Sequence, residues 1–293
     1  MATTKKQATN KTKSFPGKKQ NEQPGKEHKM ELKPEFIRRY YKGSDKLKGK
    51  IALITGGDSG IGRAVAVHFA REGADISIVY LNEDKDAKDT QKLVEKEGRK
   101  CLIIKGDIAD EKFCVECIKK TRKELGGLNI LVNNAVEQHP KEDIKEITNK
   151  QVRQTFETNI LSFFYLTLEA VKKMKKGDSI INSTSITAFR GSHHLIDYSS
   201  TKGAILSFTR SLSKSLAEKG IRVNAIAPGP VWTPLIVSTF DNKKIKEFGQ
   251  DVPMGRAGQP SEIAPAYVFL ASQDGSYVTG QTIHVNGGEI VGG

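Results

Sequence analysis

Short apolar runs alternate along most of the chain with longer segments in which apolar residues recur every three or four positions. The short runs are nearly continuous in apolar residues, as expected for strands that are covered on both faces. They predict strands at Ile51–Thr55, Ile76–Tyr80, Cys101–Lys105, Leu128–Asn133, Ser179–Ser183, Arg222–Ala225 and Gln281–Val285. The periodic segments predict helices at about 60–72, 84–97, 110–125, 150–175, 198–219 and 260–272.

The repetition of strand and helix in this order predicts a parallel sheet with helices on both faces. We expect residues 47–293 to form one doubly wound α/β domain. The longest irregular stretch, 231–260, contains three prolines. Because a long irregular stretch in a compact α/β domain is usually a functional loop, we predict one here.

Residues 1–46 differ in character from the rest of the chain. Up to Met30 they are polar, with Phe15 almost alone as an apolar side chain. Such a segment buries too little surface to offset its ordering entropy by itself. We interpret residues 1–46 as a basic arm that is flexible or lies along the surface of the same or a neighbouring subunit. We expect the chemistry to be largely unaltered without it.

The net charge of +13 is concentrated in this arm. Residues 1–50 hold 15 Lys and Arg against 5 Asp and Glu, whereas residues 51–293 hold 32 against 29. A nucleic-acid partner is therefore not expected for the domain. The chain shows no apolar run near the roughly 18 residues of a membrane span and no secretory signal, and its three cysteines are too few for a disulfide framework. These observations favour a cytoplasmic location for the protein.

The first predicted strand leads directly into a glycine-rich loop, and a helical pattern follows at once. Glycine permits the tight turn in which backbone amides and a helix N-terminus approach a pyrophosphate. The spacing differs from a plain G-x-G-x-x-G pattern, because three residues separate Gly56 from Gly60. We predict a dinucleotide site at Gly56, Asp58, Ser59, Gly60, Ile61 and Gly62.

The choice between NAD and NADP depends on the end of the second strand, where an acid binds the ribose hydroxyl or a base binds a 2′-phosphate. This position is occupied by Tyr80, Leu81 and Asn82, which provide neither the acid nor the base. Asp58 in the loop would repel a 2′-phosphate, so the sequence slightly favours NAD over NADP. After the third strand, Asp107–Ile108 is placed to meet the adenine edge.

Tyr198 and Lys202 are four residues apart in a predicted helix, which puts the phenol and the ammonium on one face. A neighbouring cation favours the phenolate, and lowering the pKa of a tyrosine from about 10 to about 7 takes about 4 kcal/mol. The pair is a candidate general acid/base, although Tyr-x-x-x-Lys alone is a common pattern.

Several other motifs accompany this pair in a fixed order. They are Asn133-Asn134-Ala135 after the fourth strand, Asn159 in the next helix, Ser185 after the fifth strand, Pro228-Gly229-Pro230, and the stretch from Pro253 to Ala264. With the Thr-Gly-x-x-x-Gly-x-Gly loop, they resemble the short-chain dehydrogenase/reductase family from about Leu47 to Gly293. The resemblance implies a seven-stranded Rossmann-type sheet and a homotetramer or homodimer built through the helices at 150–175 and 198–219.

The resemblance also implies roles for single residues. Tyr198 would exchange a proton with the alcohol or carbonyl, and Ser185 would hydrogen-bond the substrate oxygen. Lys202 would lower the pKa of Tyr198 and bind the nicotinamide ribose, and Asn159 would hold a water in a proton relay. Implied cofactor contacts are Asn133, Ala135, Tyr198, Lys202, Pro228, Gly229, Val231 and Thr233.

Candidate substrate contacts, besides Ser185, are Val136, His194 and Trp232. Val136 occupies a place where the family often has Gly, so its side chain would narrow the site near the nicotinamide. His194 either lines the substrate site or shapes a loop. Trp232, with Phe240 and Phe248, either forms an apolar lid or fills core.

We predict no metal site. Cys114 and Cys117 form a Cys-x-x-Cys pair inside a predicted helix, and no second pair completes a zinc site, so helix packing is the better interpretation.

The sequence therefore predicts an oxidoreductase that transfers a hydride between NAD or NADP and an alcohol or carbonyl, with Tyr198 as general acid/base. One alternative is a nucleotide-sensing or nucleic-acid-binding protein that uses the arm as its contact. The presence of Asn159, Ser185, Tyr198 and Lys202 argues against it, since a sensor needs no proton donor. An epimerase or dehydratase that keeps its cofactor bound is a second alternative, and the spacing of the glycine loop favours the dehydrogenase.

Overall fold

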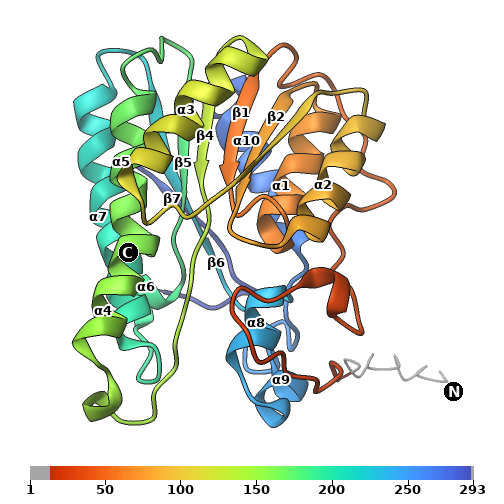
Figure 1. Ribbon diagram of the computed structural model, residues 1–293, viewed down its shortest axis with the longest axis vertical. Coiled ribbons are helices and arrows are strands. Elements are labelled where there is room, and N and C mark those ends of the chain that lie inside the picture. Colours follow the sequence, from red (N-terminus) through yellow and green to blue (C-terminus); the bar gives the residue numbers. More distant parts are fainter. Residues whose placement is uncertain (1–13, 292–293) are drawn as a thin grey trace, which may run out of the picture.

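Seven parallel strands form the central sheet, in the order β3-β2-β1-β4-β5-β6-β7 (Figure 1). The structure is a computed structural model, and it describes residues 14–291. The strands are β1 Ile51–Thr55, β2 Asp75–Tyr80, β3 Cys101–Lys105, β4 Ile130–Asn133, β5 Ser179–Ser183, β6 Arg222–Pro228 and β7 Thr282–Val285. Every neighbouring pair is parallel, which confirms the predicted fold class.

Helices cover both faces of the sheet (Figure 1). Helices α1 (Gly60–Arg71), α2 (Asp84–Lys96) and α10 (Pro260–Ala271) enclose one hydrophobic core. Helices α3 (Glu111–Leu125), α5 (Ser162–Ala170) and α7 (Ile196–Leu216) enclose the other. Among residues 14–291, no helix has the length and apolar character needed to cross a bilayer. The cytoplasmic location stays a prediction.

The chain runs from β1 outward to β3 and then crosses to β4 on the other side of β1. At such a switch point the loops that follow the two neighbouring strands diverge. They leave a crevice at the carboxyl ends of the strands, where ligands bind in open α/β sheets. The fold therefore places a site between the loops after β1 and β4.

In helix α3, residues at the two ends determine where the helix begins and where it stops. Asp110 caps its N-terminus by accepting a hydrogen bond from the amide of Lys112 at 2.8 Å. Gly126 ends the helix at a φ of +90°. Cys114 and Cys117 lie on the buried face, and burial raises the pKa of the Cys117 thiol to about 12. Both cysteines are packing residues, as predicted.

The helix expected at 150–175 is interrupted, so that prediction was wrong in part. The structure has α4 (Asn149–Phe156), then a π-helical turn η3 (Glu157–Leu161), then α5, which ends at Ala170. A π turn adds one residue to the helix, which changes the apolar periodicity too little to be seen in the sequence. Asn159 lies within this turn.

The stretch 231–260 is less irregular than predicted. It contains two short helices, α8 (Pro234–Thr239) and α9 (Asn242–Glu247). Trp232, Ile236, Val237 and Ile245 form a small separate core together with Met30 from the arm. These helices have no clear apolar periodicity in the sequence, because each has only six residues and part of the core they pack in comes from the arm.

Residues 14–46 lie along the surface of the same chain, and Figure 1 shows this segment beside α8 and α9. The ring of Phe15 stacks on Trp232, with centroids 4.0 Å apart. The amide of Gln20 donates to the carbonyl of Val237 in α8 at 2.7 Å. The first 13 residues of the predicted arm fall outside the described residues.

Candidate active site

The loop after β1 folds tightly over the start of α1. Gly60 has a φ of +52°, a conformation that disfavours side chains. A Cβ on Gly62 would lie 1.9 Å from the carbonyl oxygen of Gly56, so only glycine allows the helix to begin this close to the strand. The turn brings the N-terminus of α1 to the carboxyl edge of the sheet, where helix amides can bind an anionic ligand.

Thr55 joins this loop to the one after β4. Its hydroxyl accepts hydrogen bonds from the amides of Asn134 (2.8 Å) and Ala135 (3.0 Å). The side chain of Asn134 donates in turn to the carbonyl of Thr55 at 3.0 Å. These bonds fix the two loops that bound the switch-point crevice. Asn134 was not among the predicted residues, although it lies between two that were.

A cavity of about 400 Å³ lies along these loops. It extends from the glycine loop to the ends of β2 and β3, which is the extent that the pyrophosphate and adenosine of a dinucleotide require. The residues present therefore fit such a cofactor. Predicted cofactor residues that line this cavity are Gly56, Asp58, Ser59, Gly60, Ile61, Tyr80, Leu81, Asp107, Ile108 and Ala135.

Three predicted cofactor residues line neither this cavity nor the larger one described below. Asn82 is exposed beyond the end of β2, and Gly62 serves the turn itself. The side chain of Asn133 is buried within the fold, where it donates to Asn182 at 2.9 Å. Asn133 faces away because side chains alternate between the two faces of a strand, so its predicted contact with the cofactor is not supported.

Two buried carboxyl groups line the adenosine end of this cavity, Asp58 and Glu83. Burial, followed by the charge of Glu83, raises the pKa of Asp58 to about 7. Burial also raises the pKa of Glu83. Glu83 stands three residues beyond the end of β2, past the usual place of an acid that binds the ribose, so the sequence did not mark it as a cofactor contact. The buried carboxyl of Glu83 thus adds to that of Asp58 at this cavity.

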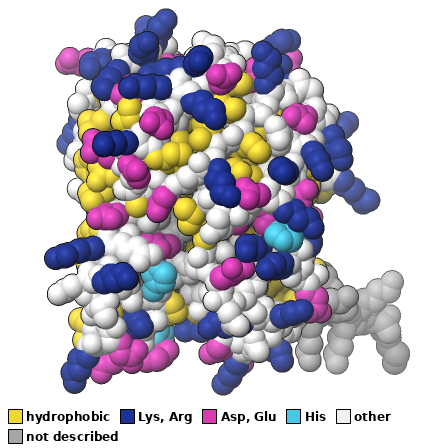
Figure 2. Space-filling view, in the orientation of Figure 1, with side chains coloured by type: hydrophobic (Ala, Val, Ile, Leu, Met, Phe, Trp, Pro, Cys, Tyr) yellow, Lys and Arg dark blue, Asp and Glu magenta, His cyan; other side chains and the backbone are white. Residues whose placement is uncertain are grey.

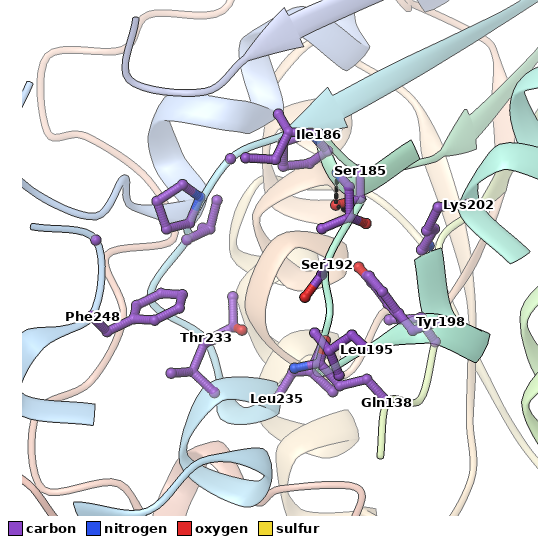
Figure 3. Close-up of a pocket in the computed structure, with 18 of the residues that line it drawn as sticks. Gln138, Ser185, Ile186, Ser192, Leu195, Tyr198, Lys202, Thr233, Leu235 and Phe248 are labelled. Carbon is purple, nitrogen blue, oxygen red and sulfur yellow. Dashed lines mark hydrogen bonds between the residues drawn. The ribbon is translucent and has the colours of Figure 1, made fainter. Parts of the chain in front are cut away.

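A second cavity, of about 800 Å³, adjoins the first, and both are lined by Ile61, Asn134 and Thr233. It collects the catalytic candidates Ser185, Tyr198 and Lys202, and Figure 3 shows the Tyr198 hydroxyl and Ser185 directed into the same space. Other predicted residues in its lining are Val136, His194, Pro228, Gly229, Val231 and Thr233.

Tyr198 and Lys202 lie one turn apart on α7, with the Lys202 Nζ 5.3 Å from the centroid of the Tyr198 ring. Lys202 donates to the carbonyl of Ser183 at 2.8 Å. Ser185, just after β5, accepts hydrogen bonds from the amide (3.2 Å) and the hydroxyl (3.1 Å) of Thr187. The end of β5 and helix α7 therefore hold the catalytic side chains in place.

Burial controls the protonation of this pair. Burial raises the pKa of Tyr198 to about 12, against the opposing effect of a hydrogen bond with Ser185. Burial lowers the pKa of Lys202 to about 7. Burial and Ser185 account for the shift of the Tyr198 pKa, and the expected lowering by Lys202 stays a prediction. Tyr198 is protonated and able to donate a proton.

Asn159 lies outside the cavity and is fully buried. Its Oδ1 accepts from the amide of Glu137 (2.9 Å), and its Nδ2 donates to the carbonyl of Glu137 (2.9 Å) and to the hydroxyl of Thr201 (3.2 Å). The side chain thus ties the loop after β4 to α7 at Thr201, which is three residues after Tyr198 and directly before Lys202. The structure shows this positioning contact, and the predicted water relay stays a prediction.

Trp232 does not reach the substrate cavity. Its side chain is only 1% exposed, and the indole nitrogen donates to the carbonyl of Leu32 at 3.0 Å. The predicted substrate contact is therefore not supported, since Phe15 of the arm completes a core around the ring. Phe240 and Phe248, in contrast, line the cavity. In residues 14–291, no cluster of three His, Cys, Asp or Glu side chains has the arrangement of a metal site.

Comparison with known proteins agrees with this geometry. A family model described as "Enoyl-(Acyl carrier protein) reductase" matches residues 56–289. The chain is 49% identical to glucose and ribitol dehydrogenase from Daucus carota, with 95% of this chain and 98% of that protein covered. It is 50% identical to NADPH-dependent aldehyde reductase 1, chloroplastic, from Arabidopsis thaliana, with 93% and 97% covered.

A solved structure has the same fold. The short chain dehydrogenase from Burkholderia cenocepacia J2315, crystallised in complex with NADP, aligns with a TM-score of 0.79 and 27% identity, and the alignment covers 83% of this chain and 98% of that one. The protein is a nicotinamide-dependent oxidoreductase, and the comparisons give no support to a sensor or nucleic-acid-binding protein. The chain belongs to the short-chain dehydrogenase/reductase family.

Proposed function

We propose that the protein transfers a hydride between a nicotinamide cofactor and an alcohol or carbonyl, with Tyr198 exchanging the proton at the substrate oxygen. The main support is that Tyr198 and Ser185 converge in a cavity that adjoins the glycine-loop cavity (Figure 3). A proton donor next to a cofactor that performs hydride transfer suffices for carbonyl reduction.

Each of the four predicted catalytic side chains would have a separate role in this reaction. The nicotinamide ring, when bound, supplies or accepts the hydride. Ser185 would hold the substrate oxygen within reach of the Tyr198 hydroxyl. Lys202, bonded to the carbonyl of Ser183, would bind the nicotinamide ribose and influence the charge of the phenol. Asn159 would keep α7 and the loop after β4 at a fixed separation.

We propose NAD as the preferred cofactor. The support is that Asp58 and Glu83 both line the adenosine end of the cavity, where a 2′-phosphate would meet two carboxyls. The Burkholderia structure holds NADP and the Arabidopsis relative is named for NADPH, which argues in the opposite direction. Calorimetry with both cofactors decides the matter, and tighter binding of NADP would overturn the preference.

The substrate we propose is a small polar alcohol or aldehyde. Polar and charged side chains, among them Gln138, His194, Lys244 and Glu247, line the larger cavity along with apolar ones such as Phe248. Such a mixed lining suits a polyhydroxylated chain, and the carrot relative is named for glucose and ribitol. Val136 lines both cavities and would limit the bulk of the substrate near the nicotinamide.

We also propose a homotetramer or homodimer that assembles through α5 and α7. Leu161, Phe164 and Leu168 form an exposed apolar stripe that is 38%, 40% and 61% exposed. The ring of Phe164 lies 4.4 Å from that of Phe208 in α7. Figure 2 shows hydrophobic side chains gathered on the side of the molecule where these helices lie. Such a stripe marks an interaction surface more often than a free face.

The decisive experiment follows the absorbance of reduced nicotinamide with aldehydes, ketones and polyols, comparing the parent with Tyr198→Phe. We expect kcat to fall about 10²- to 10⁴-fold, which is the range for a lost general acid. The dissociation constant for NADH should change less than about twofold, since the phenol oxygen is only one contact.

Tyr277→Phe is the matched control, because Tyr277 is fully exposed. Retained turnover in Tyr198→Phe would remove Tyr198 from the chemistry. A substrate that is converted with no net change in nicotinamide absorbance would favour the epimerase or dehydratase.

A further inference from the structure

Glu27 of the arm is anchored in the glycine-rich loop. It is only 2% exposed, and its carboxylate accepts a hydrogen bond from the amide of Gly60 at 2.7 Å. The same carboxylate forms an ion pair with Arg63, whose side chain also donates to the carbonyl of Asp58 at 2.7 Å. Glu27 thus binds both the amide of Gly60 and the side chain of Arg63, which itself donates to the backbone of the glycine-rich loop.

The neighbouring backbone of the arm is anchored to α2. The amides of Glu27 and His28 donate to the two carboxylate oxygens of Asp86, each at 2.9 Å. Asp86 is fully buried. A buried carboxylate that binds two consecutive amides holds a chain in one position, so this part of the arm is a fixed element of the fold.

A few residues earlier, the arm crosses the cofactor cavity. Gln23, Pro24 and Gly25 line that cavity opposite the glycine loop. The side chain of Gln23 exchanges two hydrogen bonds with the backbone of Gln138, accepting at 2.9 Å and donating at 3.0 Å. A Cβ on Gly25 would lie 2.3 Å from the carbonyl oxygen of Pro234 at the start of α8. The arm therefore joins the loop after β4 to α8 across the cavity.

The two ends of this segment hold α8 and α9 in place. Phe15 stacks on Trp232, and Met30 is buried in the same small core as Ile236 and Ile245. We call residues 15–30 the strap. Helix α8 carries lining residues of both cavities, and α9 carries lining residues of the larger one. The contacts that hold these helices therefore also set the width of the cavities.

We propose that the strap is a working part of the cofactor site, with Glu27 and Gln23 as positioning residues that hold the glycine loop and the wall of the cavity around the dinucleotide. The cofactor would enter and leave past residues 23–25, so detaching the strap speeds its release. This differs from the expectation that the arm is dispensable for the chemistry. It rests on the cofactor lying in the cavity assigned to it above.

The test measures the release of NADH by stopped-flow fluorescence, with excess NAD to prevent rebinding. The variants are Gln23→Ala, which removes both bonds to Gln138, and Gly25→Ala, which forces the strap away from Pro234. We expect release to be about tenfold faster in each, because interface changes act mostly on dissociation rates. Glu27→Gln is expected to raise the dissociation constant for NADH about tenfold as well, since the loop amide and Arg63 lose a charged partner.

Glu31→Gln is the matched control, because it makes the same change of charge at an exposed residue next to the strap. Its release rate should stay within about twofold of the parent. The chain contains one tryptophan, so Trp232 emission reports whether Phe15 is still seated in each variant. If Glu27→Gln does not fold, the rates of NADH release in Gln23→Ala and Gly25→Ala still test the proposal.

Release rates and dissociation constants within about twofold of the parent in folded Gln23→Ala and Gly25→Ala would overturn the proposal. Gly62→Ala separates this failure from failure of the cofactor site itself, because the added Cβ collides with Gly56 and must disrupt a loop that binds the cofactor. Loss of NADH binding in Gly62→Ala with unaltered release in the strap variants refutes the strap alone. Unaltered binding in Gly62→Ala refutes the site.

Discussion

Asp58→Asn should make the protein more stable at alkaline pH. Burial and the charge of Glu83 raise the pKa of Asp58 from its ordinary 3.8 to about 7. Between these two values the folded protein binds a proton that the unfolded chain has lost, so the contribution of Asp58 to stability falls as pH rises. Three pKa units at about 1.4 kcal/mol each give a cost of about 4 kcal/mol above pH 7. An asparagine, which is similar in size and uncharged, removes that cost.

Urea unfolding at pH 5 and pH 8 measures the effect. Because only part of the cost is present at pH 5, the gain of Asp58→Asn over the parent should be larger at pH 8 by roughly 3 kcal/mol. Asp89→Asn, a half-buried position on α2, controls for the loss of one negative charge. A gain that is equal at the two pH values, or a loss at pH 8, would refute the argument that ionisation of Asp58 opposes folding.

The raised pKa of Tyr198, about 12, keeps the phenol protonated between roughly pH 6 and 9, so any change of kcat for carbonyl reduction in this range should centre near pH 7, where Lys202 titrates, and a steep loss centred above about pH 8 in a pH profile would contradict this. Trp232→Ala removes the ring on which Phe15 stacks and should lower the free energy of unfolding by about 3–5 kcal/mol in urea titrations, whereas a loss below about 1 kcal/mol would show that the small core collapses to fill the space. Leu168→Glu puts a charge in the exposed stripe beside Phe164 and should reduce the mass measured by light scattering, and an unchanged mass would exclude this face as an interface.

The sequence was informative wherever a pattern is local. The apolar runs of the buried strands, the glycine loop, and the four-residue spacing of Tyr198 and Lys202 each depend on neighbouring residues only. The structure confirms the predicted sheet and brings Ser185 into the same cavity as that pair.

Features that depend on distant parts of the chain were not predictable. Glu27 stands 33 residues before Gly60 in a polar segment without periodicity, so no pattern marks it as a partner of the loop. Trp232 was as compatible with a lid as with core, because the ring that covers it comes from Phe15. The protonation of Tyr198 depends on how deeply it is buried, which spacing does not reveal.

The π turn at Glu157–Leu161 joins α4 to α5 and changes the directions in which the side chains before and after it point. The extra residue rotates everything beyond it by about 100° relative to an uninterrupted α-helix. Within the turn Asn159 faces the loop after β4, and beyond it Phe164 and Leu168 are exposed. Deleting a single residue here would straighten the helix without removing any contact residue, yet it would turn the apolar stripe away from its surface. The placement of Asn159 and the direction of the apolar stripe are thus coupled through one inserted residue, so this turn should tolerate substitutions far better than changes of length.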